Sequence, residues 1–423
     1  MSLSGVTAHA QFTSGGVYDG GISFIGESNS WTFSATTGER IVLRKVQLSA
    51  TNGFAVRMRT YDPDGVLINT TSAGGVDEYA FTATATGTFT VLLADGSGAE
   101  SGTGTYRIYF VKLPGGFTIP PGDDGGALPG SGEFQNGTIG SLGDLDLWTF
   151  PVTTGERIVL RKVQLSATNG FAVRMRTYDP NGVLIDTTSA GGVDEYAFTA
   201  TATGTFTVLL ADGSGAQSGT GTYRIYFVKL PGVYGTPIGD QGGEIANGSS
   251  FVGTIETGDI DVWSFNACNG DAFMLQLDEL TGGSSFVPQM RLYGRDGVLL
   301  NTASHQTTAQ ISRAAPATGT YTIIVNDASG PLNGTGTYQL TGIGIKTGLT
   351  LCQPVVTGAN VFLSAAGGTT NATAVLFAHT NATTLRSLWP SVWTNQFDQY
   401  GVFTRTNPFN PTEPQRYFLL KQD

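Results

Sequence analysis

The chain has 423 residues, of which 13% are charged and 60 are glycine, and its formal net charge is −11. The negative charge argues against nucleic acid as the main partner, because phosphate binding needs a basic footprint. Two cysteines are too few for a disulfide framework, and no apolar run reaches the roughly 18 residues of a membrane-spanning helix. Abundant glycine, few charges and no long helix-forming run are typical of an all-β protein with several small domains.

The N-terminal residues carry glycine and serine but no clear strand pattern, and we expect a flexible lead-in over residues 1–19. Ala8-His9-Ala10 has the small residues of a signal-peptidase cleavage site, although no charged or apolar segment precedes it. We expect an exported protein whose signal peptide is not present in this chain, located outside the cell or at the cell surface.

Residues 20–115 contain short segments in which apolar and polar side chains alternate, as they do in half-buried strands. Phe54, Val56 and Met58 show this alternation most clearly. Asp64-Gly65 predicts a tight hairpin turn, because glycine adopts positive φ freely and aspartate tolerates it. About eight short strands at regular spacing predict an antiparallel β-sandwich of the jelly-roll type.

The segment that begins at Ile41 breaks this alternation. Ile41 and Leu43 have one parity, whereas Val46 and Leu48 have the other. A strand with one buried face changes parity only through an extra residue, so we predict a β-bulge near Arg44-Lys45.

A long internal repeat sets the domain organisation. Thr36–Gly115 recurs as Thr153–Gly232 with three differences in 80 positions, and a third, more divergent copy follows. A repeat of this length is a whole small domain, because solenoid units are roughly 20–50 residues long. The equivalent positions include Trp31, Trp148 and Trp263, then Tyr61, Tyr178 and Tyr293, then Tyr106, Tyr223 and Tyr338.

The sequence therefore predicts an all-β chain of three tandem jelly-roll-like antiparallel β-sandwich domains and a smaller C-terminal β-sandwich module. The expected domains are residues 20–115, 136–232 and 251–346, with the C-terminal module at 347–423. Residues 116–135 and 233–250 are rich in glycine and proline and are the expected linkers.

The repeats resemble a known family of accessory domains. Gly143–Phe150 and Gly258–Phe265 share the pattern Gly-Asp-x-Asp-x-Trp-x-Phe, and a Gly-Thr-Tyr strand ends each repeat. This order resembles the bacterial pre-peptidase C-terminal domain, a β-sandwich appended to secreted proteases and other exported proteins. The resemblance implies an accessory role, with calcium bound near the domain entrance in some members. The first copy departs from the pattern, since it has Glu27-Ser28-Asn29 in place of Asp-x-Asp.

The tail resembles a different module. Asn360–Ser364, Trp393–Asp398 and Pro414–Leu419 are similar to a short β-module that ends many large exported proteins of Verrucomicrobia-like bacteria. That resemblance supplies no function.

Paired carboxylates are the candidate metal ligands. Aspartates at positions i and i+2 place both side chains on one face of a strand, which suits calcium with its six to eight oxygen ligands. The alternative is that these acids cap turns or pair with arginines. Calcium is the only cofactor considered, and the candidate ligands are Asp144, Asp146, Asp259 and Asp261.

Catalytic residues are not expected. His9, His305 and His379 lie in three different modules, and none has a neighbour at metal-ligand spacing. A zinc site or a Ser-His-Asp triad would therefore require assembly across domains. We expect a protein that is not an enzyme.

The first two domains carry most of the basic residues and offer a candidate ligand-binding stripe. Such a stripe could bind an acidic polymer or a neighbouring domain, and the alternative is a solvated face with cross-strand ion pairs. The candidate residues are Arg44, Lys45, Arg57 and Arg59, with Arg161, Lys162, Arg174 and Arg176 in the second copy.

Cys268 follows the strand at Trp263, and Cys352 begins the tail after a short junction. We expect a disulfide between them that locks the tail to the third domain; two free buried thiols are the alternative.

Two functions remain open. The first is a non-catalytic structural or adhesive element at the cell surface, which acts as spacer, adhesin or fibre subunit and contacts extracellular polysaccharide, protein or like chains. The second is an accessory array that binds polysaccharide or protein substrates for a secreted hydrolase, with repetition providing avidity. The stripe distinguishes them: an array should present Arg57, Arg59, Arg174 and Arg176 openly, whereas a spacer should bury or pair them.

Overall fold

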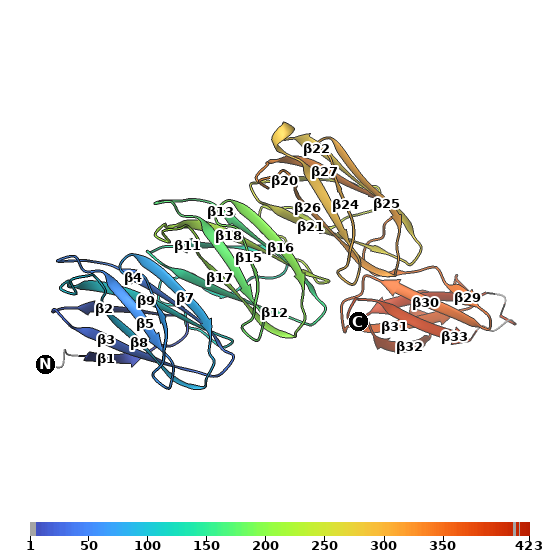
Figure 1. Cartoon of the computed structure of the whole chain (residues 1–423). Helices are drawn as coiled ribbons and strands as arrows, with labels where there is room; N and C mark the ends of the chain where they lie inside the picture. The colour runs from blue at the N-terminus through green and yellow to red at the C-terminus, as the bar shows by residue number, and fades with distance from the viewer. Residues whose placement is uncertain (1–5, 409–411, 414) are drawn as a thin grey trace.

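A computed structural model describes residues 6–408, 412–413 and 415–423. Three β-sandwich domains follow one another along the chain, and a smaller β-module lies beside the third domain at the C-terminal end (Figure 1). The predicted fold class, tandem all-β sandwiches, is confirmed. None of the helices in the described part of the chain is long and apolar enough to cross a membrane.

The first domain packs a five-stranded sheet, β1-β3-β8-β5-β6, against a four-stranded sheet, β2-β9-β4-β7. All pairs are antiparallel except β1 with β3, which is parallel. The strands are β1 (Val6–Gln11), β2 (Gly16–Ile22), β3 (Ser28–Ala35), β4 (Arg40–Gln47), β5 (Val56–Tyr61), β6 (Leu67–Thr70), β7 (Val76–Thr82), β8 (Gly87–Asp95) and β9 (Gly104–Leu113).

The second and third domains repeat this arrangement strand for strand. The second comprises β10 (Gly125–Ala127), β11 (Glu133–Ile139), β12 (Leu145–Val152), β13 (Arg157–Gln164), β14 (Val173–Tyr178), β15 (Leu184–Thr187), β16 (Val193–Thr199), β17 (Gly204–Asp212) and β18 (Gly221–Leu230). The third comprises β19 (Gly242–Glu244), β20 (Ser250–Ile255), β21 (Ile260–Ala267), β22 (Ala272–Thr281), the 3₁₀ turn η1 (Gly283–Ser285), β23 (Pro288–Tyr293), β24 (Leu299–Ser304), β25 (Thr308–Ala314), β26 (Gly319–Asp327) and β27 (Gly336–Ile343).

The C-terminal module is built from two small sheets around its own core, which includes Leu363, Leu376 and Phe403. Its elements are β28 (Thr350–Leu351), β29 (Val355–Thr357), β30 (Asn360–Ala366), β31 (Thr373–His379), the 3₁₀ turn η2 (Arg386–Leu388), β32 (Ser391–Gln396), β33 (Phe403–Pro408) and β34 (Tyr417–Gln422).

Each sandwich core contains the same buried tryptophan–tyrosine contact. In the second domain, Trp148 Nε1 donates a hydrogen bond of 2.9 Å to the Tyr223 hydroxyl. Gly137 on β11 leaves room for that hydroxyl, because a Cβ at this position would lie 2.2 Å from it. A buried tyrosine needs a hydrogen-bond partner for its hydroxyl. The tryptophan supplies that partner, and the glycine in the edge strand supplies the space for the hydroxyl. The first and third domains repeat this contact.

Two expectations about the connecting segments were wrong. Residues 6–11 and 16–22 are β1 and β2, so most of the expected lead-in is part of the first sandwich. The linkers likewise contain β10 and β19, and β11 begins at Glu133 inside the first expected linker. Pairing with a longer neighbour, as β2 pairs with β9, makes strands of these glycine-rich segments despite their low propensity.

The predicted bulge in β4 was also wrong. β4 pairs in continuous register with both β7 and β9. Ile41 and Leu43 lie in the core of the first domain, whereas Val42 and Val46 lie in a second cluster shared with the next domain. The strand is buried on both faces, so its apolar residues need not alternate.

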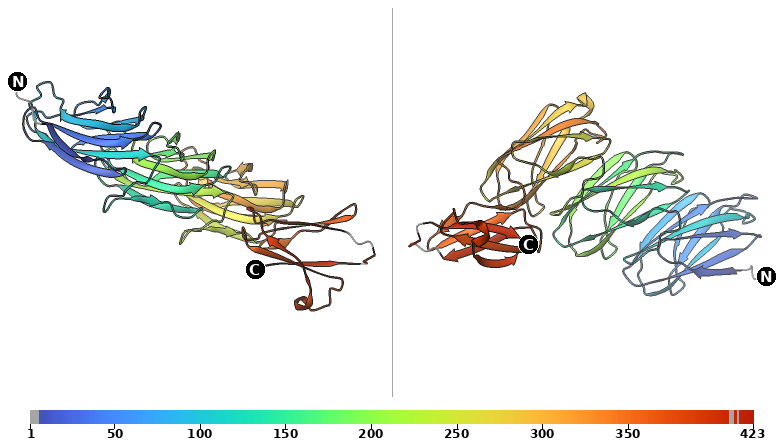
Figure 2. Two further views of the ribbon diagram at one scale, coloured as in Figure 1. Left: turned by 90° about the horizontal axis from the view of Figure 1, so that it is seen from below. Right: turned by 180° about the vertical axis from the view of Figure 1, so that it is seen from behind.

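The three sandwiches are stacked face to face in one direction, as Figure 2 shows. In the first and second domains, the outer face of the four-stranded sheet meets the outer face of the next domain's five-stranded sheet. Val42, Val46 and Tyr109 of the first domain pack with Leu147 and Leu209 of the second in one apolar cluster. A corresponding cluster joins the second and third domains.

Candidate functional site

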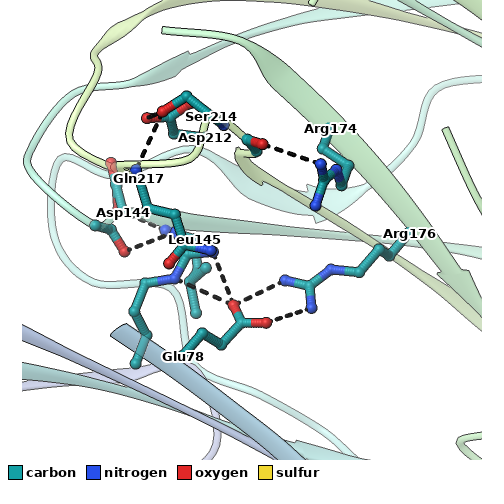
Figure 3. Close-up of polar contacts among 11 residues, drawn as sticks. Glu78, Asp144, Leu145, Arg174, Arg176, Asp212, Ser214 and Gln217 are labelled. Atoms are coloured by element: carbon teal, nitrogen blue, oxygen red, sulfur yellow. Dashed lines mark hydrogen bonds and ion pairs between the residues drawn. The ribbon is translucent and has the colours of Figure 1, made fainter. Parts of the chain in front are cut away.

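The two domain junctions hold the most unusual polar groups of the chain. Within the first apolar cluster, Glu78 on β7 forms ion pairs with Arg44 of its own domain, at 2.8 Å, and with Arg176 of the second domain, at 2.6 Å. Figure 3 shows Glu78 reaching across the junction to Arg176. The guanidinium of Arg176 is bidentate, with its second bond to Glu78 at 2.9 Å, which is the strongest geometry for this pair.

The second junction repeats this triad with Arg161, Glu195 and Arg291. Arg161 also donates to the backbone carbonyls of Gly258 and Asp259 in the third domain, at 3.3 and 2.9 Å. The two triads therefore fix the orientation of each domain on its neighbour, in addition to the apolar contact.

The arginines control the charge of the shared glutamates. Burial alone would raise the pKa of Glu78, but Arg44 and Arg176 outweigh it and lower the pKa to about 2. The pKa of Glu195 is lowered for the same reason, by Arg161 and Arg291. A carboxylate that stays ionised in a buried site depends on both of its partners, so removal of either one leaves an uncompensated charge.

Glycines allow the domains to approach closely. Gly143 has φ +76°, and a Cβ at this position would lie 2.3 Å from Val46 of the first domain. Gly258 has the same role in the second junction, where a Cβ would lie 2.5 Å from Val163. The glycine of the Gly-Asp-x-Asp pattern is therefore required by the domain contact.

The expected basic stripe does not form an open surface. Of the two ligands considered for it, the neighbouring domain is the one that Arg44, Arg161 and Arg176 contact. Four of the stripe residues are buried: Arg44, Lys45, Arg161 and Lys162. The two arginines belong to the triads. Lys45 donates a hydrogen bond to the backbone carbonyl of Gly74, and Lys162 donates one to that of Gly191. The two arginines are covered by the next domain, which the sequence of one domain cannot reveal, whereas the two lysines bond within their own domain.

The remaining stripe residues are half-buried and differ in their contacts. Arg174 donates to the carbonyl of Gly213 within its own domain, at 3.0 Å, and Arg176 enters the triad. Arg57 and Arg59 have no ion-pair partner among the residues that the structure describes. Within the described part of the chain, Arg59 thus differs from its equivalents Arg176 and Arg291, which each pair with a glutamate of the preceding domain.

Two clusters of three aspartates lie beside the junctions. Asp123 joins Asp144 and Asp146 in the first, with one carboxylate oxygen from each residue lying within 4.8 Å of the others. Asp240 joins Asp259 and Asp261 in the second cluster with the same spacing. The structure thus brings together both predicted Asp-x-Asp pairs and adds a ligand to each from the linker.

One oxygen of each innermost aspartate has no partner. Tyr223 donates to Asp146 Oδ2 at 2.5 Å, and Tyr338 donates to Asp261 Oδ2 at 2.5 Å. Asp146 Oδ1 and Asp261 Oδ1 are buried and accept no hydrogen bond from the described residues. A buried carboxylate oxygen without a donor is costly, so each of these atoms could take a shared proton or a cation.

Burial and mutual repulsion make the aspartates of both clusters resist ionisation. Burial, followed by the neighbouring carboxylates of Asp144 and Asp123, raises the pKa of Asp146 to about 9. Burial and Asp240 raise the pKa of Asp259 to about 6. Like charges held this close resist ionisation together, and a divalent cation would remove the conflict.

No such cluster occurs among the described residues of the first domain. Glu27 and Asn29 occupy the positions of Asp144 and Asp146. The Asn29 amide donates to the Gly21 carbonyl at 2.7 Å and to the Tyr106 hydroxyl at 2.8 Å, which is the reverse of the hydrogen bond that Asp146 accepts. The departure seen in the sequence therefore replaces a charged cluster by a neutral network.

Sequence reasoning missed Asp123 and Asp240 as cluster members. Both follow a Pro-x-Gly motif, Pro120-Pro121-Gly122 and Pro237-Ile238-Gly239, at the same place in the two linkers. This repetition of Pro-x-Gly-Asp ahead of each Gly-Asp-x-Asp segment was the available signal.

The remaining predicted site residues fall outside the junctions. Cys268 and Cys352 form a disulfide, with their Cα atoms 5.7 Å apart. His9 stacks on Trp31, while His305 and His379 accept hydrogen bonds from the nearby backbone. The three imidazoles thus remain in three separate domains and share no site.

No protein-family model matches the chain, and no curated protein sequence matches it significantly. Among solved structures, it is similar to the pre-peptidase C-terminal domain of a collagenase from Bacillus anthracis, at 17% identity over 24% of this chain and 95% of that one, with a TM-score of 0.21.

Two further structures show comparable likeness. One is PliG, a periplasmic inhibitor of g-type lysozyme from Aeromonas hydrophila, at 10% identity over 25% of this chain and 96% of that one, with a TM-score of 0.19. The other is the tandem CBM22-1-CBM22-2 segment of Paenibacillus barcinonensis Xyn10C, at 9% identity over 52% and 93%, with a TM-score of 0.16. At these TM-scores the likenesses support no conclusion about family, ligand or reaction.

Proposed function

We propose that this chain is a non-catalytic, rigid multidomain rod that serves as a structural or adhesive element outside the cell or at its surface. One observation carries the proposal. Each pair of sandwich domains shares an apolar cluster and a buried Arg-Glu-Arg triad instead of a flexible hinge. Domain interfaces of this kind suppress the relative motion that is otherwise expected between linked domains.

The alternative, an array of repeated ligand-binding modules, fits the same observation poorly. Avidity requires equivalent open sites on successive repeats. Arg44 and Arg176 instead bind Glu78 between the domains, so they are not available to an external ligand. A rigid spacer requires only firm contacts between successive domains, and the apolar clusters and triads are contacts of this kind.

The aspartate clusters are part of the proposal as calcium sites. Three carboxylates at each site supply up to six oxygens, and calcium takes six to eight oxygen ligands. Because Asp123 and Asp240 come from the linkers and the other ligands come from the following domain, a bound ion would tie each linker to the domain it precedes. Calcium would therefore stiffen the rod at both junctions.

The calcium sites can be tested by thermal unfolding in 1 mM calcium and in excess chelator. We expect calcium to raise the midpoint, since an ion that binds only the folded state stabilises it by mass action. Asp146→Asn with Asp261→Asn should abolish the shift without preventing folding, because the first domain already carries Asn29 at this position. Asp64→Asn is the matched control, since Asn181 occupies its equivalent.

Equal midpoints with and without calcium, together with no heat of binding in a calorimetric titration, would contradict the calcium proposal. That result would leave the rod itself untouched, because the apolar clusters and triads do not involve the aspartates.

The absence of catalysis is tested by incubation with a broad panel of peptides and polysaccharides. We expect no turnover from the wild-type chain. Robust turnover that is lost on substitution of Asp144 and Asp146 by alanine would overturn the proposal, whereas binding without turnover would favour the accessory array.

A further inference from the structure

From the pattern of repeated junctions we infer that the outer face of the first domain's five-stranded sheet is a docking site. The partner is a β-sandwich domain other than the three described above, and it presents a valine–tyrosine sheet face with a glutamate at the Glu78 position. The open face comprises Phe24, Ile25, Arg59, Tyr61, Leu92 and Ala94.

Most of this face is already known to dock, because an identical copy of it does so within the same chain. Arg59, Tyr61, Leu92 and Ala94 lie within the nearly identical repeat and correspond to Arg176, Tyr178, Leu209 and Ala211. In the second domain, Tyr178, Leu209 and Ala211 are almost fully buried against the first domain. In the first domain the same residue types on the same strands are half-exposed. The local fold is equal, so the difference is the missing partner.

The loop beside this face is the most exposed apolar feature of the first domain. Ile25 is 68% exposed and Phe24 is 51% exposed. Their equivalents, Leu142 and Ser141, contact the first domain: Leu142 packs on the apolar cluster, and the Ser141 hydroxyl lies 2.8 Å from the Tyr109 hydroxyl. An exposed patch of large apolar residues marks an interaction site, and here it lies where the docking loop of the second domain makes its contacts.

Charge identifies what the partner must carry. Arg59 has no hydrogen-bond or ion-pair partner among the described residues, whereas its equivalents Arg176 and Arg291 each bind the glutamate of the preceding domain. A carboxylate placed as Glu78 is placed would complete a triad on the open face. Charge complementarity of this kind selects partners and fixes orientation.

The largest apolar difference between the open face and the docked one lies on β3 and β12. Ser28 and Ser30 on β3 replace Leu145 and Leu147 on β12. This part of the partner contact is therefore more polar than the junctions within the chain, as is usual for an interface that exists in both free and bound states.

None of the three sandwich domains described above offers such a face to a second copy of the chain. The Glu78 and Glu195 faces are both covered by the following domains. The equivalent face of the third domain has Gln276 and Gln310 in place of the Arg44–Glu78 pair, and Asp278 in place of Val46. Gln276 donates to Asp278 at 2.8 Å, so these polar groups bond within the face, and Gln310 leaves no carboxylate at the position where Arg59 would need one. Copies of the chain therefore do not stack head to tail.

The test converts the third domain into a partner. A bait is made from the full chain with Gln276→Arg, Asp278→Val, Gln310→Glu and Thr341→Tyr, which restore the residue types found at 44, 46, 78 and 109. The bait also carries Arg59→Glu, so that it cannot bind another copy of itself. The prey is the wild-type chain, and the control prey carries Arg59→Glu alone.

We expect a one-to-one complex of bait and wild-type prey in light scattering and in surface-binding measurements. The Arg59→Glu prey should bind at least about tenfold more weakly, because loss of a buried charge partner raises the dissociation rate. A bait that unfolds cooperatively like the wild type yet binds neither prey, or binds both equally, would overturn the inference.

A second chain keeps the inference testable if the bait does not fold. Residues 1–124 are joined ahead of residue 8 of the full chain, which places a natural Glu78 face before the open face without redesigning any surface. We expect X-ray scattering to show one longer rigid rod, and Arg59→Glu in the second copy to release the added domain. An added domain that moves freely in the unsubstituted fusion would overturn the inference.

Discussion

The junctions between sandwich domains and the junction to the C-terminal module are held in different ways. The first two bury sheet faces around a charged triad. The last joins the end of the third domain to the module through the Cys268–Cys352 disulfide and a few polar contacts. Among these, the Asn266 amide donates to the Gly348 carbonyl at 3.1 Å. The same chain therefore uses non-covalent docking where two broad faces meet and a covalent bond where they do not.

The surface of the third domain explains the change. Its outer four-stranded face carries Gln276, Asp278 and Gln310, whose hydrogen bonds are made within the face. Such a face gains little from being covered, because apolar burial drives association. It ends the stack, and the module attaches at the domain's edge instead. Three predictions test this contrast, from the largest expected effect to the smallest.

Glu78→Ala should have the largest effect. It leaves Arg44 and Arg176 buried without their counter-charge, and we expect a loss of about 3–5 kcal/mol in unfolding free energy, assigned to the first two domains. Urea unfolding monitored by intrinsic fluorescence would measure it. Gln310→Ala is the control, because Gln310 occupies the equivalent position on the outer four-stranded face of the third domain. It should change the unfolding free energy by less than about 0.5 kcal/mol. Similar losses in the two variants would show that the triad does not hold the junction.

Reduction of the disulfide should affect only the last junction. Removing the cross-link restores chain entropy to the unfolded and undocked states, with an expected loss of about 2–4 kcal/mol. The Cys352→Ser variant should show increased protease sensitivity near residue 348 while the three-domain stack unfolds as before. Thiol titration of the denatured, unreduced wild type should find no free cysteine. Two titratable thiols would contradict the bond.

Acid should weaken the first two junctions selectively. The pKa of Glu78 is about 2 in the folded chain, against a model-peptide value of 4.5. Its contribution is therefore fully present above pH 4.5 and is lost as the pH falls toward 2, because the unfolded state then binds a proton that the folded state resists. Glu78→Gln should remove this part of the pH dependence. A wild type and variant with parallel stability curves below pH 4.5 would exclude Glu78 as the group responsible.

Much of the fold could be predicted from the repeat and from alternation within single strands. On β5, the buried Val56 and Met58 alternate with half-buried arginines because only one face of the strand lies in the core, and the sandwich follows from such strands. β4 was misread because Val42 and Val46 are buried by another domain. Prediction from alternating side chains assumes that a strand has one buried face. A strand whose second face is buried by another domain loses the alternation and is mistaken for a strand with a bulge.

The candidate sites show the same limit. The Asp-x-Asp pairs could be found because both ligands lie on one strand, two residues apart. Asp123 and Asp240 approach them only after the linker folds back, which no local pattern encodes. The arginines were recognised as a set, but their burial depends on which face meets which domain. Spacing within a strand is readable from sequence, whereas docking between domains is a property of two surfaces.

The central claim is that the sandwich domains form one rigid body, and small-angle X-ray scattering of the full chain in calcium tests it most directly. The account predicts a pair-distance distribution of a single elongated particle that one rigid structure fits. It also predicts that Glu78→Ala combined with Glu195→Ala broadens this distribution to that of separately moving domains. A wild-type profile that requires a flexible ensemble, unchanged by the double substitution, would contradict the account.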